Sequence, residues 1–179
     1  TFFEIIVGFI LGIILGIYTG ILFIISKTTR RWLFPFIIFM QAIPIFALAP
    51  VLTLWFGYGI WSKIIMTTTI IYFPITIAFY DGLKRINPMI VNMAKLMGAN
   101  KITMLTKIRI PHALPHLSSG LKLAAAFAPM GAIIGEWVGS SNGLGYLMLY
   151  ASGRVQIDLM FSAIIILAIF TLLLYNITS

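Results

Sequence analysis

The two histidines of the chain, His112 and His116, are four residues apart, a spacing at which side chains on one helix can share a metal ion. A zinc site needs further ligands, and no acidic residue lies near this pair in the sequence. Pro115 stands between the histidines and is expected to interrupt the helix. The sequence therefore predicts no metal site here.

Three glycines, Gly139, Gly143 and Gly145, form the second pattern that could carry chemistry, because glycine-rich loops can cradle phosphate. No lysine followed by serine or threonine comes after them, and G-x-x-x-x-G-K-[ST] does not occur in the chain. An intramembrane enzyme would need a nucleophile with a base or a metal set, and neither pattern is present. We expect no catalytic residues, no bound cofactor and no ATP site in this chain.

Composition indicates a membrane protein: of 179 residues, 61% are hydrophobic and 9% charged, against about 25% charged in soluble domains. Spanning a bilayer takes roughly 20 apolar residues. We expect an all-α polytopic fold, one transmembrane domain over residues 1–179. The five predicted spans lie at about 4–26, 32–56, 60–80, 118–138 and 159–178.

The net charge of +8 would suggest nucleic acid in a soluble protein, but here the placement of the charges matters more. Ten of the twelve basic residues fall in or beside the segments 26–31 and 81–117. Basic residues stay on the cytoplasmic side, so these segments are predicted to face the cytoplasm, with no nucleic-acid partner. The chain then starts outside and begins with Thr1, so we expect a natural N-terminal span or signal before it.

Glycine recurs every four residues in the first span and leaves one helix face without side chains. Such a face allows another helix to approach closely. Packing within the subunit is the favoured interpretation, and dimerisation is the alternative. The four positions are Gly8, Gly12, Gly16 and Gly20.

Candidate residues of a translocation path come from two spans. Gln41 and Pro44 lie in the proline-rich second span, which either borders a polar pathway or is a kinked packing helix. Glu136 and Trp137 end the fourth span on its outer side. A carboxylate there must reach water, a basic partner or a lumen, so a pathway role and an interfacial role both stay open.

The basic segment 81–117 has its own helix signals. Asn87 is a good N-cap, Pro88 suits the first helical position, and Gly98 suits a left-handed C-terminal cap. Asn100 can cap a second helix, expected to end before Pro111. The first helix is too apolar for water and too charged for lipid, which favours docking onto a protein over lying on the membrane.

This segment resembles the E-A-A, three residues, G, nine residues, I, one residue, L-P motif of permease subunits of bacterial ABC importers. The resemblance covers nearly the whole chain, and Asn92 stands where that motif has glutamate, so it can offer only a neutral hydrogen bond. The residues that this resemblance assigns to ATPase coupling are Asn92, Met93, Ala94, Gly98, Ala99, Ile108 and Pro111.

The chain looks like the nitrate, sulfonate, taurine and thiamine-precursor permeases of the inner membrane, and "APMGAIIGEWVGSSNGLGYLM" is most similar to those for pyrimidine precursors of thiamine. The resemblance implies a cytoplasmic ATPase dimer holding ATP and Mg, an external solute-binding protein and a second permease subunit, expected to be a second copy. A pyrimidine is the expected solute, with nitrate, sulfonate or taurine as alternatives. An ATP-independent carrier or channel is a further alternative, although the chain shows no internal repeat or mid-membrane charge.

Overall fold

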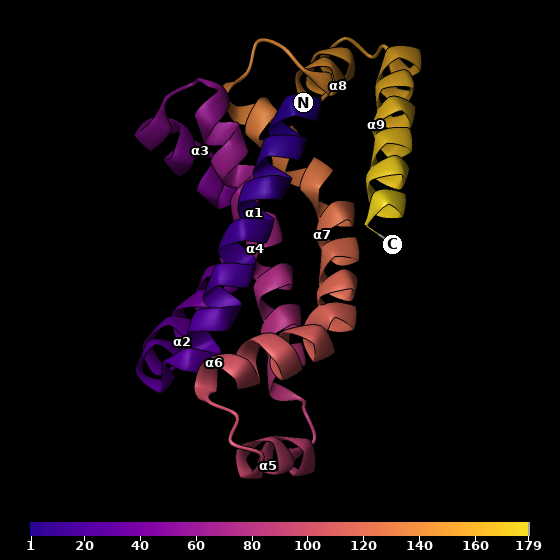
Figure 1. The fold of residues 1–179 in the computed structure, drawn as a ribbon. Helices are drawn as coiled ribbons and strands as arrows, with labels where there is room; N and C mark the ends of the chain where they lie inside the picture. The colour runs from indigo at the N-terminus through magenta and orange to yellow at the C-terminus, as the bar shows by residue number, and fades with distance from the viewer. Residues whose placement is uncertain (179) are drawn as a thin grey trace.

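The computed structural model describes residues 1–178, which form helices joined by short loops (Figure 1). The helices in chain order are α1 (Phe2–Ile25), α2 (Lys27–Ala42), α3 (Ile45–Phe56), α4 (Ile60–Lys84), α5 (Pro88–Leu96), α6 (Lys101–Met104), the π-helix η1 (Leu105–Arg109), α7 (Ile110–Gly139), α8 (Leu144–Gly153) and α9 (Ile157–Ile177).

Four helical segments are long and apolar enough to cross a membrane: α1, α4, the stretch Lys101–Gly139 and α9. A fifth crossing is possible if α2 and α3 count together, although they meet at 105°. This confirms the all-α polytopic class. The segment predicted as the second span, 32–56, is divided into two helices, because Ile43 before Pro44 is extended (φ −72°, ψ 126°) and ends α2.

Helix α4 lies at the centre of the fold, between α1 and α7 (Figure 1). The junction of α1 with α2 and the helix α5 lie at one end of the molecule, while α8 lies at the other end, near the N-terminus. The two basic segments predicted to face the cytoplasm therefore share one end. We call this the inner end and the α8 end the outer end.

The glycine face of α1 packs against α4. A Cβ at Gly8 would lie 2.8 Å from Thr67, and one at Gly12 would lie 2.6 Å from Ile71. Gly16 and Gly20 meet the next two turns of α4 at similarly short distances. Because no side chain fits between the helices at these positions, the prediction of packing within the subunit is confirmed.

The prediction that a helix ends before Pro111 is wrong. Helix runs without a break from Lys101 to Gly139, through both Pro111 and Pro115. The wide π-turn, in which Ile110 N–H donates to Leu105 O, shifts the hydrogen-bond register directly before Pro111. Pro111, which has no N–H to donate, then follows the π-turn as the second residue of α7.

Pro115 likewise does not interrupt the helix that carries the two histidines. Both lie in α7, with ring centroids 6.5 Å apart. A membrane helix tolerates proline where neighbouring groups satisfy the freed carbonyls. Among residues 1–178 no group of three or more potential ligand side chains could hold a metal ion.

Candidate functional site

At the inner end, α5 is bounded by an N-cap at one end and a glycine turn at the other. Asn87 Oδ1 accepts from Met89 N–H at 2.9 Å, so the predicted N-cap is confirmed. At the other end Gly98 has φ +80°, and Ala99 N–H donates to Ala94 O at 2.9 Å. Asn100 Oδ1 accepts from Thr103 N–H at 2.7 Å and starts the return helix. The sequence therefore folds locally as a projecting helix closed by a glycine turn.

The residues expected to couple to an ATPase are only partly at the surface. Met93 and Asn92 are exposed on α5, beside Leu96 (88% exposed) and Met97 (85% exposed). Ala94 is buried instead. Of the remaining expected residues, Gly98 and Pro111 are exposed, and Ala99 and Ile108 are half-buried.

Arg109, to which the sequence analysis assigned no role, connects the two ends of the segment that contains α5. The guanidinium of Arg109 donates to the carbonyl of Leu83, in the last turn of α4, at 2.8 Å. A cation bound to a carbonyl at a helix C-terminus is favourable because the helix dipole is negative there. The link joins the end of α4 to η1, directly before α7.

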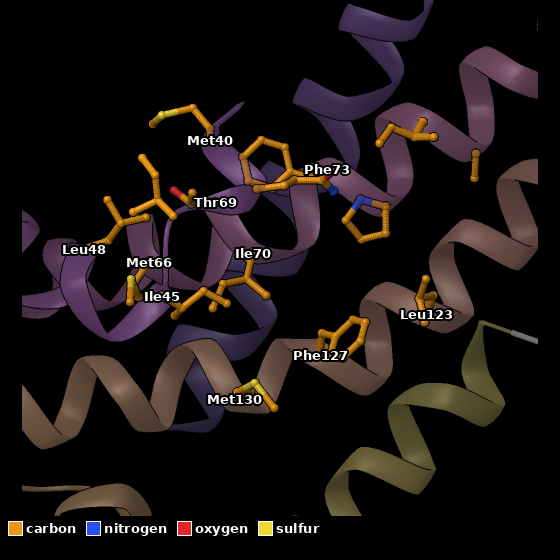
Figure 2. A pocket seen from close by; sticks show the side chains of 15 residues that line it. Met40, Ile45, Leu48, Met66, Thr69, Ile70, Phe73, Leu123, Phe127 and Met130 are labelled. Atoms are coloured by element: carbon orange, nitrogen blue, oxygen red, sulfur yellow. The ribbon is translucent and has the colours of Figure 1, made fainter. Parts of the chain in front are cut away.

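A cavity of about 470 Å³ lies where α2, α3, α4 and α7 meet (Figure 2). Its walls include the break between α2 and α3, and α7 contributes Phe127 and Met130, which are 39% and 48% exposed, so the cavity is open to the surface. Thr69 and Gln41 are its polar side chains, and none of its lining residues is charged. The full lining is Met40, Gln41, Ile43, Ile45, Leu48, Met66, Thr69, Ile70, Phe73, Pro74, Ile77, Ala78, Leu123, Phe127 and Met130.

The four residues expected to line a pathway fall in two places. Gln41 lines this cavity, and Pro44 stands at the start of α3 between two lining residues. Glu136 and Trp137 lie instead near the outer end of α7. Trp137 stacks on Phe46 with ring centroids 6.0 Å apart. Of the four, Gln41 alone is a lining residue of the cavity, and Trp137 contacts α3 two residues after Pro44.

The carboxylate of Glu136 is 1% exposed and holds the loop after α7. Its Oε2 accepts from Gly145 N–H at 2.6 Å, and its Oε1 accepts from the Thr1 hydroxyl. That hydroxyl also accepts from Leu144 N–H at 2.8 Å. The glycine-rich loop thus encloses an internal carboxylate, which explains its glycines without an external phosphate.

A second buried charge, that of Lys63, binds the first residue of the same loop. Lys63 Nζ lies 2.8 Å from Ser140 Oγ and 3.5 Å from an oxygen of Glu4. All three groups come from different parts of the chain, so sequence reasoning missed the cluster. Its one signal was Lys63 itself, the single charge between two long apolar runs.

Thr67, Thr68 and Thr69 donate to carbonyls one turn back in α4, for example Thr69 Oγ1 to Ile65 O at 2.8 Å. Such bonds satisfy a hydroxyl inside a membrane helix with an acceptor from its own helix. Thr69 nevertheless differs from its neighbours, because it also faces the cavity.

Comparisons with known proteins agree on one family. The family model described as "Binding-protein-dependent transport system inner membrane component" matches residues 9–179. A "Probable ABC transporter permease protein" of Haemophilus influenzae is 48% identical over 98% of this chain and 71% of its own length. The "Formylaminopyrimidine transport permease protein ThiX" of Halalkalibacterium halodurans is 41% identical over 68% of this chain, which spans about half of that relative (48%).

Among solved structures, a chain of the inward-facing MetNI methionine ABC transporter superposes with a TM-score of 0.83. The match covers 99% of this chain and 88% of that one, at 20% sequence identity. At this identity the likeness concerns the fold.

Proposed function

The chain belongs to the family of binding-protein-dependent transport system inner membrane components, and from this we propose that it forms the membrane path of an ATP-driven importer for a small solute. It is a multi-pass protein of the inner membrane. The observation that carries the proposal is α5, whose apolar face projects from the inner end and is exposed among residues 1–178. Helices that present methionine and leucine in this way fit grooves on partner proteins.

ATP and Mg belong, in this proposal, to a separate cytoplasmic ATPase dimer that receives α5. Closure of the ATPases moves α5, and the Gly98 turn and the bond from Arg109 to Leu83 carry the movement into α4 and α7. These two helices form much of the wall of the cavity. Movement of α5 therefore changes the walls around the solute.

The other proposed partners are a second copy of this permease and an external solute-binding protein. The solute is a pyrimidine precursor of thiamine, which the name of the ThiX relative supports. The alternative solutes are nitrate and sulfonates such as taurine. An ATP-independent carrier is the competing mechanism.

Gentle affinity purification of the full-length protein from its native membrane tests the proposal. We expect a phosphate-loop ATPase among the bound proteins by mass spectrometry. Leu96→Asp should release it, because a charge would enter the apolar face of α5, whereas Val155→Asp should not. Val155 is a matched control, 77% exposed but next to α8 at the outer end. Recovery of the chain alone, with uptake that follows an ion gradient, would refute the proposal.

A further inference from the structure

We infer that the cavity between α2, α3, α4 and α7 selects an uncharged heteroaromatic solute and rejects anions, with Thr69 and Gln41 as its specificity-determining residues. This inference rests on the proposed function and narrows its substrate class. It concerns the cavity lined by Gln41, Thr69 and Phe127, and not the charged cluster at the outer end.

The absence of charge from the lining residues is the first argument. Anionic solutes such as sulfonates lose their hydration on entering an apolar cavity and need a cation or several donors in return. No lysine, arginine or histidine is among the lining residues. Lys122 precedes the lining residue Leu123 in α7 but is not part of the wall, and Lys63 pairs with Glu4 near the outer end.

The apolar groups of the wall suit a flat ring. Phe73 of α4 and Phe127 of α7 line the cavity together with three methionines, Met40, Met66 and Met130. Aromatic rings stack favourably with other rings, and methionine sulfur contacts ring edges well. The volume of about 470 Å³ lies within the range of about 300–1,000 Å³ for small-molecule sites and has room for a one-ring heterocycle.

Thr69 provides a defined hydrogen-bond acceptor. Its hydroxyl proton is already committed to Ile65 O at 2.8 Å, so the oxygen that faces the cavity can only accept. An amino group on a ring is a matching donor, whereas a sulfonate or nitrate oxygen would meet this oxygen as a second acceptor. Polar contacts of this kind discriminate strongly, because an unmatched polar group in an apolar site loses its hydration without compensation.

Gln41 offers the complementary chemistry from the other wall. Its amide carries both a donor and an acceptor, which ring nitrogens and exocyclic amino groups can use. It lies near the C-terminal end of α2, close to the break at Ile43. The polar contacts are therefore contributed by two walls, α2 and α4, that are not continuous in the chain.

One feature favours an anion instead. The N-terminus of α3 begins at Ile45, a lining residue, and a helix N-terminus attracts negative charge. Import of a sulfonate is consequently the result that most directly opposes the inference.

The test uses the full-length permease assembled with its ATPase and solute-binding protein in proteoliposomes. Formylaminopyrimidine and taurine serve as the two labelled probes, each measured with and without ATP. We expect ATP-dependent uptake of the pyrimidine and none of taurine. Thr69→Val should lower pyrimidine uptake about five- to ten-fold, as expected for one lost neutral hydrogen bond. Thr69→Ser, which keeps the hydroxyl, should restore uptake to near the wild-type rate.

Thr171→Val is the matched control. Thr171 lies in α9, bonds back to Leu167 O at 2.7 Å in the same way, and does not line the cavity. Pyrimidine uptake by the Thr171→Val variant should equal that of the wild type. Three results would each overturn the inference while the importer function stands. The first is uptake of taurine, and the second is pyrimidine uptake that Thr69→Val does not change. The third is ATP hydrolysis with uptake of neither probe. A purified complex without any ATPase would overturn the proposed function itself.

Discussion

Glu136 and Gly145 are joined by a hydrogen bond of 2.6 Å from the glycine N–H to the buried carboxylate, across the turn that ends α7. A Cβ at Gly145 would lie 2.8 Å from Glu136 Oε2, and one at Gly143 would collide with the same carboxylate. The outer loop is therefore folded around a charge supplied by the helix before it. Small residues in this loop are required by that close approach.

Gly145→Ala should destabilise the protein. The added Cβ would lie 2.8 Å from Glu136 Oε2 and 3.0 Å from the backbone of Ile133, so the loop must shift and weaken a hydrogen bond to a charged group, a loss of about 1.5–3 kcal/mol. Thermal unfolding of the full-length protein in detergent measures this. Gly153→Ala is the control, since its Cβ meets nothing within 4 Å. Equal melting temperatures for both variants would contradict the role of Glu136.

Lys63→Met should loosen the start of the outer loop. Its ammonium binds Ser140 and pairs with Glu4, so its removal takes one cation from a buried carboxylate and a hydrogen bond from Ser140. The sequence has no cysteine, so Asn142→Cys gives one labelling site in this region for a membrane-impermeant maleimide. Labelling should become faster in the Lys63→Met background.

Removing both charges provides the control for that experiment. Lys63→Met combined with Glu4→Gln leaves no unpaired ion, so its labelling rate should return toward that of the parent, because apolar or neutral replacement of a whole buried pair is often tolerated. A double variant that labels as fast as the single one would show that the two residues do not act as a pair.

Gly12→Ala should disturb the contact of α1 with α4. The added Cβ would lie 2.6 Å from the Ile71 side chain, and overpacking of this kind costs about 1–3 kcal/mol. Ile71→Ala makes room for it, so the double variant should be more stable than the sum of the single effects predicts. Thermal unfolding of all four proteins closes the cycle, and strict additivity would mean that the helices do not meet there.

Gly98→Ala tests the glycine turn after α5. No atom lies within 4 Å of its Cβ position, so the whole effect comes from the left-handed φ of +80°, about 1–2 kcal/mol. Gly98→Pro should be stronger and abolish ATPase binding in pull-down assays, since proline cannot adopt this φ and loses the N–H bond to Lys95 O. Gly59→Ala, also without neighbours but at φ −77°, should bind normally. Binding by the proline variant would remove the turn from the coupling mechanism.

Local patterns were read correctly where one helix or one turn decides the structure. The caps at Asn87 and Asn100 and the turn at Gly98 follow from backbone rules within a few residues. The predictions that Pro111 and Pro115 interrupt a helix were wrong. The rule that Pro111 ends a helix fails because the preceding π-turn changes the hydrogen-bond register, which residue preferences do not encode.

The amino-acid sequence by itself determined the membrane class, the end of the molecule that carries the basic segments, and the projecting α5, because hydropathy, charge placement and capping act locally. Only the tertiary structure decided which polar groups meet. It placed Gln41 and Thr69 on two walls of one uncharged cavity, and it placed Lys63 against Ser140 and Glu4 near the outer end. The physical reason is that burial stabilises a polar side chain only next to a partner, and these partners come from different helices, whose packing brings them together.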